Sequence, residues 1–238
     1  ALADVDAGGL EAVRAAVGDR AEVSLHPLDV ADRPSLDALP DAVAAAHGGP
    51  PALLVNNAGL AHGGSFEELD EAGFDRVMAV NFEAPVRLTR ALLPRMRALP
   101  AGRIVLISSL FGLIAPPGQS AYAASKFALR GWGESLRHEL AASPLRVTVV
   151  HPGGVATGIA RNARLPAGAD PVAAAARARE FEKHLKLPPD AAARRIAEAA
   201  ARGAPRLLIG ADGRLLCLIQ RLAPARYWAA AQRLLGAA

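Results

Sequence analysis

The run Ile104-Val105-Leu106-Ile107-Ser108-Ser109 and the later stretch Tyr122-Ala123-Ala124-Ser125-Lys126 contain the features around which the fold is organised. The first run is apolar until its two final serines, which predicts a buried parallel strand whose carboxyl end carries a hydroxyl into a cleft. A helix over the second stretch would place the Tyr122 phenol and the Lys126 ammonium on one face. A nearby cation favours the phenolate, so we expect Lys126 to lower the pKa of Tyr122 and make the phenol a usable acid and base.

Two other apolar runs also end in polar or glycine-rich turns. Ala52-Leu53-Leu54-Val55 leads into Asn56-Asn57-Ala58-Gly59, and Val147-Thr148-Val149-Val150 leads into His151-Pro152-Gly153-Gly154. Helical patterns separate the three runs, and this alternation indicates a doubly wound parallel sheet. A lone Tyr-x-x-x-Lys pair is most often an ordinary helix face. Here the pair would lie beside the polar and glycine-rich turns at the carboxyl edge of such a sheet, which makes it a candidate site.

These motifs together resemble the short-chain dehydrogenase/reductase family over nearly the whole chain, including the thirteen positions from Ser109 to Tyr122. The resemblance implies an α/β fold with a Rossmann-like, doubly wound parallel sheet in three α/β/α layers, forming a single domain over residues 1–238. It also implies an NAD(P)-dependent oxidoreductase that interconverts an alcohol and a ketone or aldehyde. The positions that carry the resemblance are Asn56-Asn57-Ala58-Gly59, Asn81, Ser109, Tyr122, Lys126 and Pro152-Gly153.

Members of that family open with a strand, a Gly-x-x-x-Gly-x-Gly turn and a helix whose N-terminus binds the cofactor pyrophosphate. This chain begins Ala1-Leu2-Ala3-Asp4-Val5-Asp6, which resembles the second strand of such a fold, while Gly8-Gly9 and Gly63-Gly64 fit ordinary loops. We therefore expect the sequence to lack the first strand, turn and helix of a larger enzyme. That strand would lie at the centre of the sheet, so the expected result is a gap with two unpaired edges and an uncovered apolar face.

The resemblance assigns catalytic roles to four residues. Tyr122 is the implied general acid and base, Ser109 orients the substrate oxygen, and Lys126 adjusts the phenol while binding the nicotinamide ribose. Asn81 lies within a helical pattern from about Asp75 to Leu99, where asparagine is a weak helix former. By resemblance it distorts the helix and holds a water of a proton relay; a surface asparagine is the alternative.

The resemblance also assigns cofactor contacts, and it favours NAD over NADP because Asp4 would accept bonds from the adenosine ribose and repel a 2′-phosphate. Helix capping is the alternative role, for Asp4 or Asp6 at a helix over residues 8–17 and for Asp29 at a helix starting near Pro34. Asn56 has a structural alternative as well, because its amide can hold neighbouring strands together. The implied cofactor-binding residues are Asp4, Asp29, Val30, Asn56, Ala58, Gly59, Tyr122, Lys126, Pro152, Gly153, Val155 and Thr157.

Two segments have alternatives that the sequence leaves open. Residues 158–189, with a helical pattern near 171–187, correspond to the substrate lid of the family or to a helical ornament. Residues 211–238 predict a helical tail that lines the substrate pocket, extends a dimer contact or lies on a membrane surface, and packing within the protein is favoured.

Shorter patterns predict a strand over 21–30, a helix start at Ser65-Phe66-Glu67-Glu68, a helix over 74–81 and an apolar helix face of Phe127, Leu129, Trp132, Leu136 and Leu140.

Composition limits the class of protein. The chain has 238 residues, of which 52% are hydrophobic and 21% charged, values typical of a globular domain. Its net charge of +4 is spread among acidic residues without a basic run, so no nucleic-acid partner is indicated. The single Cys217 excludes an intrachain disulfide, no Cys/His metal cluster can be composed, and a reducing, cytoplasmic setting is expected. No apolar run approaches the length of a membrane span.

Several functional alternatives remain at this stage. The resemblance implies a homodimer or homotetramer acting on a small-molecule alcohol or carbonyl with NAD. An NADP-dependent reductase of the ketoacyl type is a second possibility, which Asp4 disfavours. A non-catalytic member of the fold is a third, supported by the absence of the glycine-rich turn. Neither the substrate nor the direction of the reaction follows from the sequence.

Overall fold

The strands form two parallel sheets. The computed structural model describes residues 1–235 apart from residues 160, 167, 169, 171, 173, 174, 177, 178, 180, 181 and 184. In the smaller sheet β1 (Leu2–Asp4) pairs with β2 (Leu25–Pro27). The larger sheet has the order β3 (Leu53–Asn56), β4 (Gly102–Ile107), β5 (Leu145–Pro152) and β6 (Arg206–Ile209). Every ladder is parallel, and helices connect the strands, which confirms the predicted doubly wound α/β fold.

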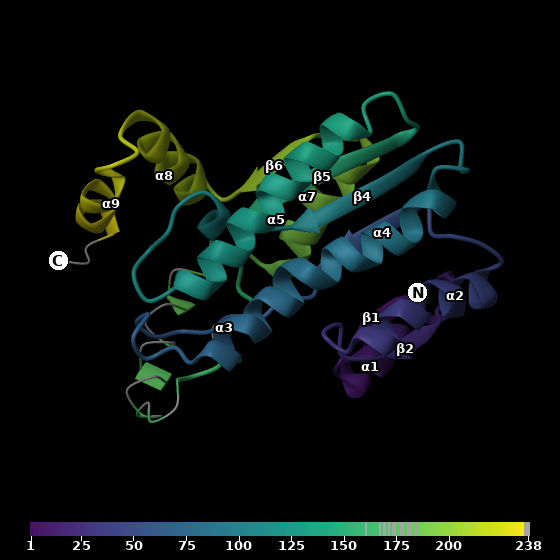
Figure 1. Ribbon diagram of the computed structural model, residues 1–238, viewed down its shortest axis with the longest axis horizontal. Helices are drawn as coiled ribbons and strands as arrows, with labels where there is room; N and C mark the ends of the chain where they lie inside the picture. Colours follow the sequence, from purple (N-terminus) through teal and green to yellow (C-terminus); the bar gives the residue numbers. More distant parts are fainter. Residues whose placement is uncertain are drawn as a thin grey trace.

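Helices cover both faces of the larger sheet. In Figure 1, α4 and α5 lie on one face and α7 on the other, while α8 and α9 lie at the opposite end of the molecule from β1 and β2. There are also three short helical segments: η1 (Gly18–Arg20) follows α1, the π-helical η2 (Ala79–Glu83) joins α3 to α4, and η3 (Leu110–Gly112) lies between β4 and α5. The α-helices are α1 (Ala7–Val17), α2 (Arg33–His47), α3 (Glu71–Met78), α4 (Ala84–Met96), α5 (Ser120–Glu139), α7 (Pro189–Ala201), α8 (Ala211–Leu222) and α9 (Tyr227–Leu235).

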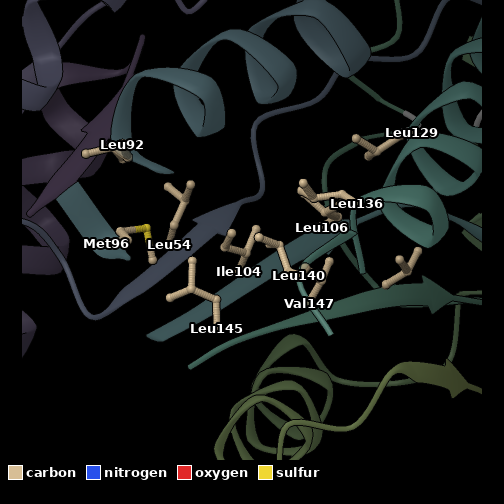
Figure 2. Close-up of a cluster of buried hydrophobic side chains, with 11 residues drawn as sticks. Leu54, Leu92, Met96, Ile104, Leu106, Leu129, Leu136, Leu140, Leu145 and Val147 are labelled. Carbon is tan, nitrogen blue, oxygen red and sulfur yellow. The ribbon is translucent and has the colours of Figure 1, made fainter. Parts of the chain in front are cut away.

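The main core lies between the larger sheet and the helix pair α4 and α5. Figure 2 shows its leucine-rich side chains, which come from β3, β4, β5 and these two helices. Helix α5 approaches the sheet closely at Gly133, where a Cβ would lie 2.5 Å from Leu106 Cδ1 and 2.9 Å from Val149 Cγ2. This contact fixes the height of α5 over the sheet. The cluster comprises Leu54, Leu92, Met96, Ile104, Leu106, Leu129, Leu136, Leu140, Leu145, Val147 and Val149.

Strand β4 is buried on both faces, as its apolar run predicted. Ile104 and Leu106 belong to the core under α4 and α5. Val105, between them, packs on the opposite side in a cluster that includes Ala192 and Ala200 of α7. A parallel strand covered by helices on both sides has no polar face, which explains why the strand is apolar without interruption from Ile104 to Ile107.

The sheet is interrupted between β1 and β3, as expected from the sequence. Within the described part of the chain no pairing joins these two strands. On β3, Leu53 and Val55 are 47% and 45% exposed, whereas Leu54 between them is 7% exposed. One face of β3 is therefore covered by the main core, and the other is an apolar face open to solvent.

The β1–β2 unit is attached to the rest of the protein through α2. Leu36 and Leu39 of α2 pack in one buried cluster with Ala84 of α4. Around this contact the Arg87 guanidinium donates two hydrogen bonds to the Asp37 carboxylate at 2.6 and 2.7 Å. This arrangement leaves the β1–β2 unit with a small interface to the larger sheet.

Two local predictions are corrected by the structure. Strand β2 occupies only part of the predicted 21–30 range. Ser65 and Glu68 form the reciprocal bonds of a capping box, at 2.7 and 3.3 Å, but α3 begins at Glu71. The Asp70 side chain caps that helix by accepting from Gly73 N at 2.7 Å, so the box closes only a single turn.

The predicted apolar face of α5 includes one wrong residue. Leu129, Leu136 and Leu140 are buried, but Phe127 is 38% exposed. At 3.6 residues per turn, two positions along a helix point to nearly opposite sides, so Phe127 cannot share a face with Leu129. Eight of the seventeen residues of the predicted helix over 171–187 lie outside the described residues. No helix in the described part of the chain is long and apolar enough to cross a membrane.

Candidate active site

The structure brings Asn81, Ser109, Tyr122 and Lys126 together at the carboxyl end of the larger sheet. Ser109 follows β4 directly and caps η3, while Tyr122 and Lys126 lie one turn apart at the start of α5. Asn81 is in the π-helical turn η2, which packs against α5. The predicted sharing of one α5 face by Tyr122 and Lys126 is confirmed, since the Lys126 Nζ lies 5.7 Å from the Tyr122 ring centroid.

The Tyr122 phenol is buried, and the Ser109 side chain is close enough to interact with it and lower its pKa. Ser109 Oγ also accepts a bond from Phe111 N at 3.1 Å, which fixes the hydroxyl at the start of η3. The Phe111 ring meets the Tyr122 ring edge to face, with centroids 6.1 Å apart and an angle of 82°. The phenol oxygen and the serine hydroxyl therefore form one preorganised polar pair in an apolar setting.

The predicted direction of the Tyr122 pKa is wrong. Burial raises the pKa of Tyr122, and the hydrogen bond with Ser109 lowers it by a smaller amount. Lys126 is 3% exposed, and burial lowers its own pKa to about 8. Its Nζ donates to the Ile107 carbonyl at 3.0 Å and lies beside the phenol ring. Loss of water around the phenol thus outweighs the effect expected from the cation.

Asn81 distorts its helix as predicted, because it lies in the π turn between α3 and α4. It is fully buried, so the surface alternative is wrong. Its Nδ2 donates to the Leu60 carbonyl at 2.9 Å and to Ser125 Oγ at 3.0 Å, and its Oδ1 accepts from Leu60 N at 2.9 Å. Ser125 Oγ in turn donates to the Tyr122 carbonyl at 2.7 Å. Asn81 thereby ties the loop after β3 to the first turn of α5.

Gly59 leaves room beside the Lys126 ammonium. A Cβ at Gly59 would lie 3.3 Å from both Lys126 Nζ and Asn81 Oδ1. Gly59 and Ala58 are exposed, whereas Asn56 is 7% exposed and its Nδ2 donates to Thr89 Oγ1 of α4 at 3.2 Å. The structural role that the sequence left open for Asn56 is therefore present, and the exposed turn after it lies next to the lysine.

Of the two residues that the sequence offered as a cap for the first helix, Asp6 has that role and Asp4 does not. Asp6 caps α1 by accepting from Gly9 N at 3.0 Å. Asp4, at the end of β1, accepts from Asp6 N at 3.0 Å and its side chain is exposed. Asp4 is therefore not a helix cap, and its carboxylate faces solvent at the carboxyl end of its strand.

Asp29 does not cap α2, because the Asp32 side chain has that role and accepts from Ser35 N at 3.3 Å. The Asp29 carboxylate instead binds the Arg76 guanidinium of α3 at 2.6 Å, and the bond lowers the pKa of Asp29. Its other oxygen accepts from Ala31 N at 2.9 Å. Val30, next to it, is partly buried against the leucines of α2.

The turn after β5 is tightly bonded within itself. Gly153 N donates to the Ile209 carbonyl at 2.8 Å, which continues the pairing of Pro152 with β6. Val155 N donates to the Gly153 carbonyl at 2.7 Å, and Thr157 N donates to the Val155 carbonyl at 2.8 Å. The Val155 N–H is thus already paired, and the exposed Thr157 is the freer of the two predicted contacts.

Sequence reasoning missed three buried polar residues that hold the site. Ser108 Oγ donates to the Lys126 carbonyl at 2.9 Å, Ser125 bridges Asn81 and Tyr122, and His151 Nδ1 lies 3.0 Å from the Ser109 carbonyl. All three lie inside stretches that the sequence had singled out. The feature of the sequence that could have indicated them is a polar residue at a position where the surrounding pattern predicts an apolar one.

The C-terminal tail packs within the protein, as favoured from the sequence. Residues of α8 and α9 form a buried cluster with Leu110 and Ile114, which lie between Ser109 and Tyr122. Tyr227 Oη accepts from Ala115 N at 2.9 Å and donates to the Ala115 carbonyl at 3.3 Å. On the other side, Arg164 N of the predicted lid donates to the Ala61 carbonyl at 2.9 Å. The tail and the lid therefore contact the two loops that lead to the site.

Comparison with known proteins agrees with this geometry. The family model described as short chain dehydrogenase matches residues 1–167. The putative oxidoreductase SadH of Mycobacterium tuberculosis (strain ATCC 25618 / H37Rv) is 42% identical over 241 residues, which cover 100% of this chain and 84% of that protein.

Solved structures give the same result. A short-chain dehydrogenase/reductase from Burkholderia phymatum in complex with NAD matches with a TM-score of 0.82 and 30% identity, covering 93% of this chain and 83% of that one. A metagenomic short-chain oxidoreductase in complex with NADP matches with a TM-score of 0.60 and 38% identity, covering 65% and 70%. The fold, the buried cluster and these similarities show that the chain belongs to the short-chain dehydrogenase/reductase family of oxidoreductases.

Proposed function

We propose that this chain interconverts an alcohol and a ketone or aldehyde by NAD-dependent hydride transfer. The observation that carries the proposal is the buried cluster in which the Lys126 Nζ lies 5.7 Å from the centroid of the Tyr122 ring, with the Ser109 side chain close enough to interact with the phenol. One group that moves a proton, one that orients an oxygen and one cation are the requirements for acid and base catalysis of carbonyl reduction.

The residues at this edge fit a nicotinamide nucleotide. Gly59 leaves open space next to the Lys126 ammonium, whose remaining hydrogens are suited to ribose hydroxyls. The exposed Asp4 carboxylate at the end of β1 is a matching acceptor for hydroxyls of a second ribose. The nicotinamide, when bound, supplies or accepts the hydride.

Tyr122 moves the proton in this mechanism. Because burial raises its pKa, the phenol is neutral at physiological pH and donates its proton to the carbonyl oxygen during reduction. Ser109 donates a hydrogen bond to the same substrate oxygen and orients it. The positive charge of Lys126 stabilises the phenolate that forms, an effect that is large in a buried site. Asn81 and Ser125 keep the start of α5 in place by their mutual bond at 3.0 Å.

The first test is Tyr122→Phe. The variant keeps the ring that contacts Phe111 and removes the proton donor, so we expect turnover to fall by about 10²- to 10⁴-fold with nucleotide binding retained. Turnover is followed by the absorbance of reduced nicotinamide with a panel of secondary alcohols and ketones. Native-like turnover by Tyr122→Phe, at an unchanged thermal unfolding temperature, would show that another group moves the proton.

The choice of NAD over NADP rests on Asp4, whose carboxylate would repel a 2′-phosphate. We expect fluorescence titration of the native chain to give tighter binding of NAD than of NADP. Asp4→Asn removes the charge and should reduce the difference in affinity between NAD and NADP. Asp19→Asn, at an exposed position in η1, should leave that difference unchanged. Tighter binding of NADP by the native chain would reverse the assignment.

A further inference from the structure

His151 makes a defined bond to the backbone of Ser109. It lies near the end of β5, is 1% exposed, and its Nδ1 is 3.0 Å from the Ser109 carbonyl oxygen. A carbonyl oxygen only accepts, so Nδ1 carries the hydrogen and the tautomer of the ring is fixed. Burial also lowers the pKa of His151 to about 4, which keeps the ring neutral with its one hydrogen in this bond.

The other ring nitrogen has no hydrogen-bond partner in the part of the chain that the structure describes. A buried polar atom without a partner is unfavourable. An apolar side chain at this position, like those elsewhere on the strand, would not have this cost. The charged groups that act on the ring are Arg130, Arg206 and Glu134, of which the two arginines oppose a second proton. The ring therefore contributes one useful polar contact, the bond to Ser109.

That bond lies where the regular sheet pairing stops. The β4–β5 ladder ends at the pair Ile107 and Val150, and Ser108 N still donates to the Val150 carbonyl at 2.9 Å. Beyond it, the Ser109 carbonyl accepts from Gly112 N at 3.0 Å within η3 and from the His151 ring. The histidine thus extends the attachment of β4 to β5 by one residue, to Ser109, whose side chain interacts with the Tyr122 phenol.

We propose that His151 is a positioning residue, which holds the Ser109 peptide so that the serine hydroxyl stays on the Tyr122 phenol. This inference rests on the proposed function for its catalytic consequence. Its structural part concerns only the chain itself: the hydrogen bond from His151 to the Ser109 carbonyl, and the interaction of the Ser109 side chain with the Tyr122 phenol. Loss of the hydrogen bond should weaken that interaction.

Two substitutions separate the bond from the packing. His151→Asn keeps an N–H donor close to the position of Nδ1, and His151→Leu fills the space without a donor. Thr148→Val is the control, because Thr148 is 1% exposed on the same strand and its hydroxyl also has no partner among the described residues. Thermal unfolding and circular dichroism establish that each variant is folded.

The first readout needs neither substrate nor cofactor. The chain has two tyrosines, so the ultraviolet difference between each variant and its own Tyr122→Phe counterpart isolates the Tyr122 phenol. Measured by rapid pH jump, the midpoint of phenolate formation should rise in His151→Leu, because the bond from Ser109 favours the phenolate. It should stay at the native value in His151→Asn and in Thr148→Val.

The second readout is turnover. In His151→Leu we expect kcat to fall about 10- to 100-fold, the size of effect that a displaced orienting group produces, with nucleotide affinity unchanged. His151→Asn should restore most of kcat. A native phenol midpoint and native kcat in His151→Leu would overturn the proposal. Equal losses in the Asn and Leu variants would also overturn it, because ring packing would then be the cause.

Two further outcomes are distinguishable. If His151→Leu does not fold, His151→Gln replaces it, because its amide lies near the Nε2 position and cannot reach the Ser109 carbonyl; a native phenol midpoint in this variant would overturn the proposal. If the phenol midpoint responds as expected but no alcohol or ketone is turned over, the positioning role of His151 stands and the proposed function fails.

Discussion

At the residue scale, the site combines two ionisable side chains that burial drives toward their neutral forms. The pKa of the Tyr122 phenol is raised, and that of the Lys126 ammonium is lowered to about 8. The ammonium donates a hydrogen bond to the Ile107 carbonyl, and the phenol interacts with the Ser109 side chain. The protonation states of both side chains are therefore set by their fixed positions and by the exclusion of water.

The charge of Lys126 should be visible in the pH dependence of stability. In the unfolded chain the ammonium keeps its proton up to about pH 10.5, but in the folded chain only up to about 8. Between these values the unfolded state binds more protons, so the contribution of Lys126 to stability rises with pH. The interval of about 2.5 pH units corresponds to about 3 kcal/mol.

Lys126→Met removes this dependence. The quantity of interest is the free energy of unfolding of the variant minus that of the native chain. We expect this difference to be largest below pH 8 and to fall by about 3 kcal/mol as the pH rises to 10.5. Urea unfolding at a series of pH values measures the difference, and turnover should be lost at every pH. A difference that does not change with pH would mean that Lys126 has the same pKa in both states.

At the element scale, the position of α5 decides whether the catalytic side chains meet. Its contacts with the sheet pass through Gly133, which touches Leu106 and Val149, while its first turn is tied to η2 by Asn81 and Ser125. The extra residue of the π turn is what directs Asn81 inward at this point. Three elements far apart in sequence are thereby locked in one arrangement.

Two glycines of α5 give a matched test of this packing. A Cβ at Gly131 meets nothing within 4 Å, so Gly131→Ala should raise the free energy of unfolding by about 0.5–1 kcal/mol through helix propensity. A Cβ at Gly133 collides with Leu106 and Val149, so Gly133→Ala should lower it by about 1–3 kcal/mol. Urea unfolding distinguishes the two, and only Gly133→Ala should reduce turnover. Equal effects from both substitutions would contradict close packing at Gly133.

At the scale of the whole molecule, the two sheets differ in how well they are supported. Strands β4 and β5 of the larger sheet are covered on both faces, whereas β1 and β2 form a two-stranded sheet of three-residue strands. Helix α1 buries a single residue, Leu10. Two-stranded sheets are marginally stable by themselves, so this unit depends on its contact through α2. Figure 1 shows the unit at one end of the molecule.

Hydrogen exchange should therefore divide the chain into two parts. We expect amides of β1, β2 and α1 to exchange through local opening at a lower free energy than amides of β4 and β5. Asp37→Asn, which removes the carboxylate bound to Arg87, should increase exchange in the first group and leave the second unchanged. Uniform protection across both groups would show that the protein opens as one cooperative unit. Exchange is measured by mass spectrometry of the native chain and this variant.

Much of the fold could be predicted because it depends on local pattern. Continuous apolar runs mark strands that are buried on both faces, and helical spacing places Tyr122 and Lys126 on one face whatever surrounds them. The order of the motifs was enough to predict the parallel sheet and the carboxyl edge where the site lies. The gap between β1 and β3 followed from the same order, because a family strand at the sheet centre had no counterpart in the sequence.

Tertiary structure alone decided how these residues behave. The pKa of Tyr122 depends on how much water is removed and on where the lysine nitrogen finally lies, and neither follows from spacing. Asp6 and Asp32 cap α1 and α2 because their carboxylates reach N–H groups in the first turns of those helices. Asp4 and Asp29 instead accept from N–H groups two residues further along the chain. His151 meets Ser109 across 42 residues of sequence. Sequence pattern determines which face a side chain takes, and its neighbours on that face are brought there by the packing of distant segments.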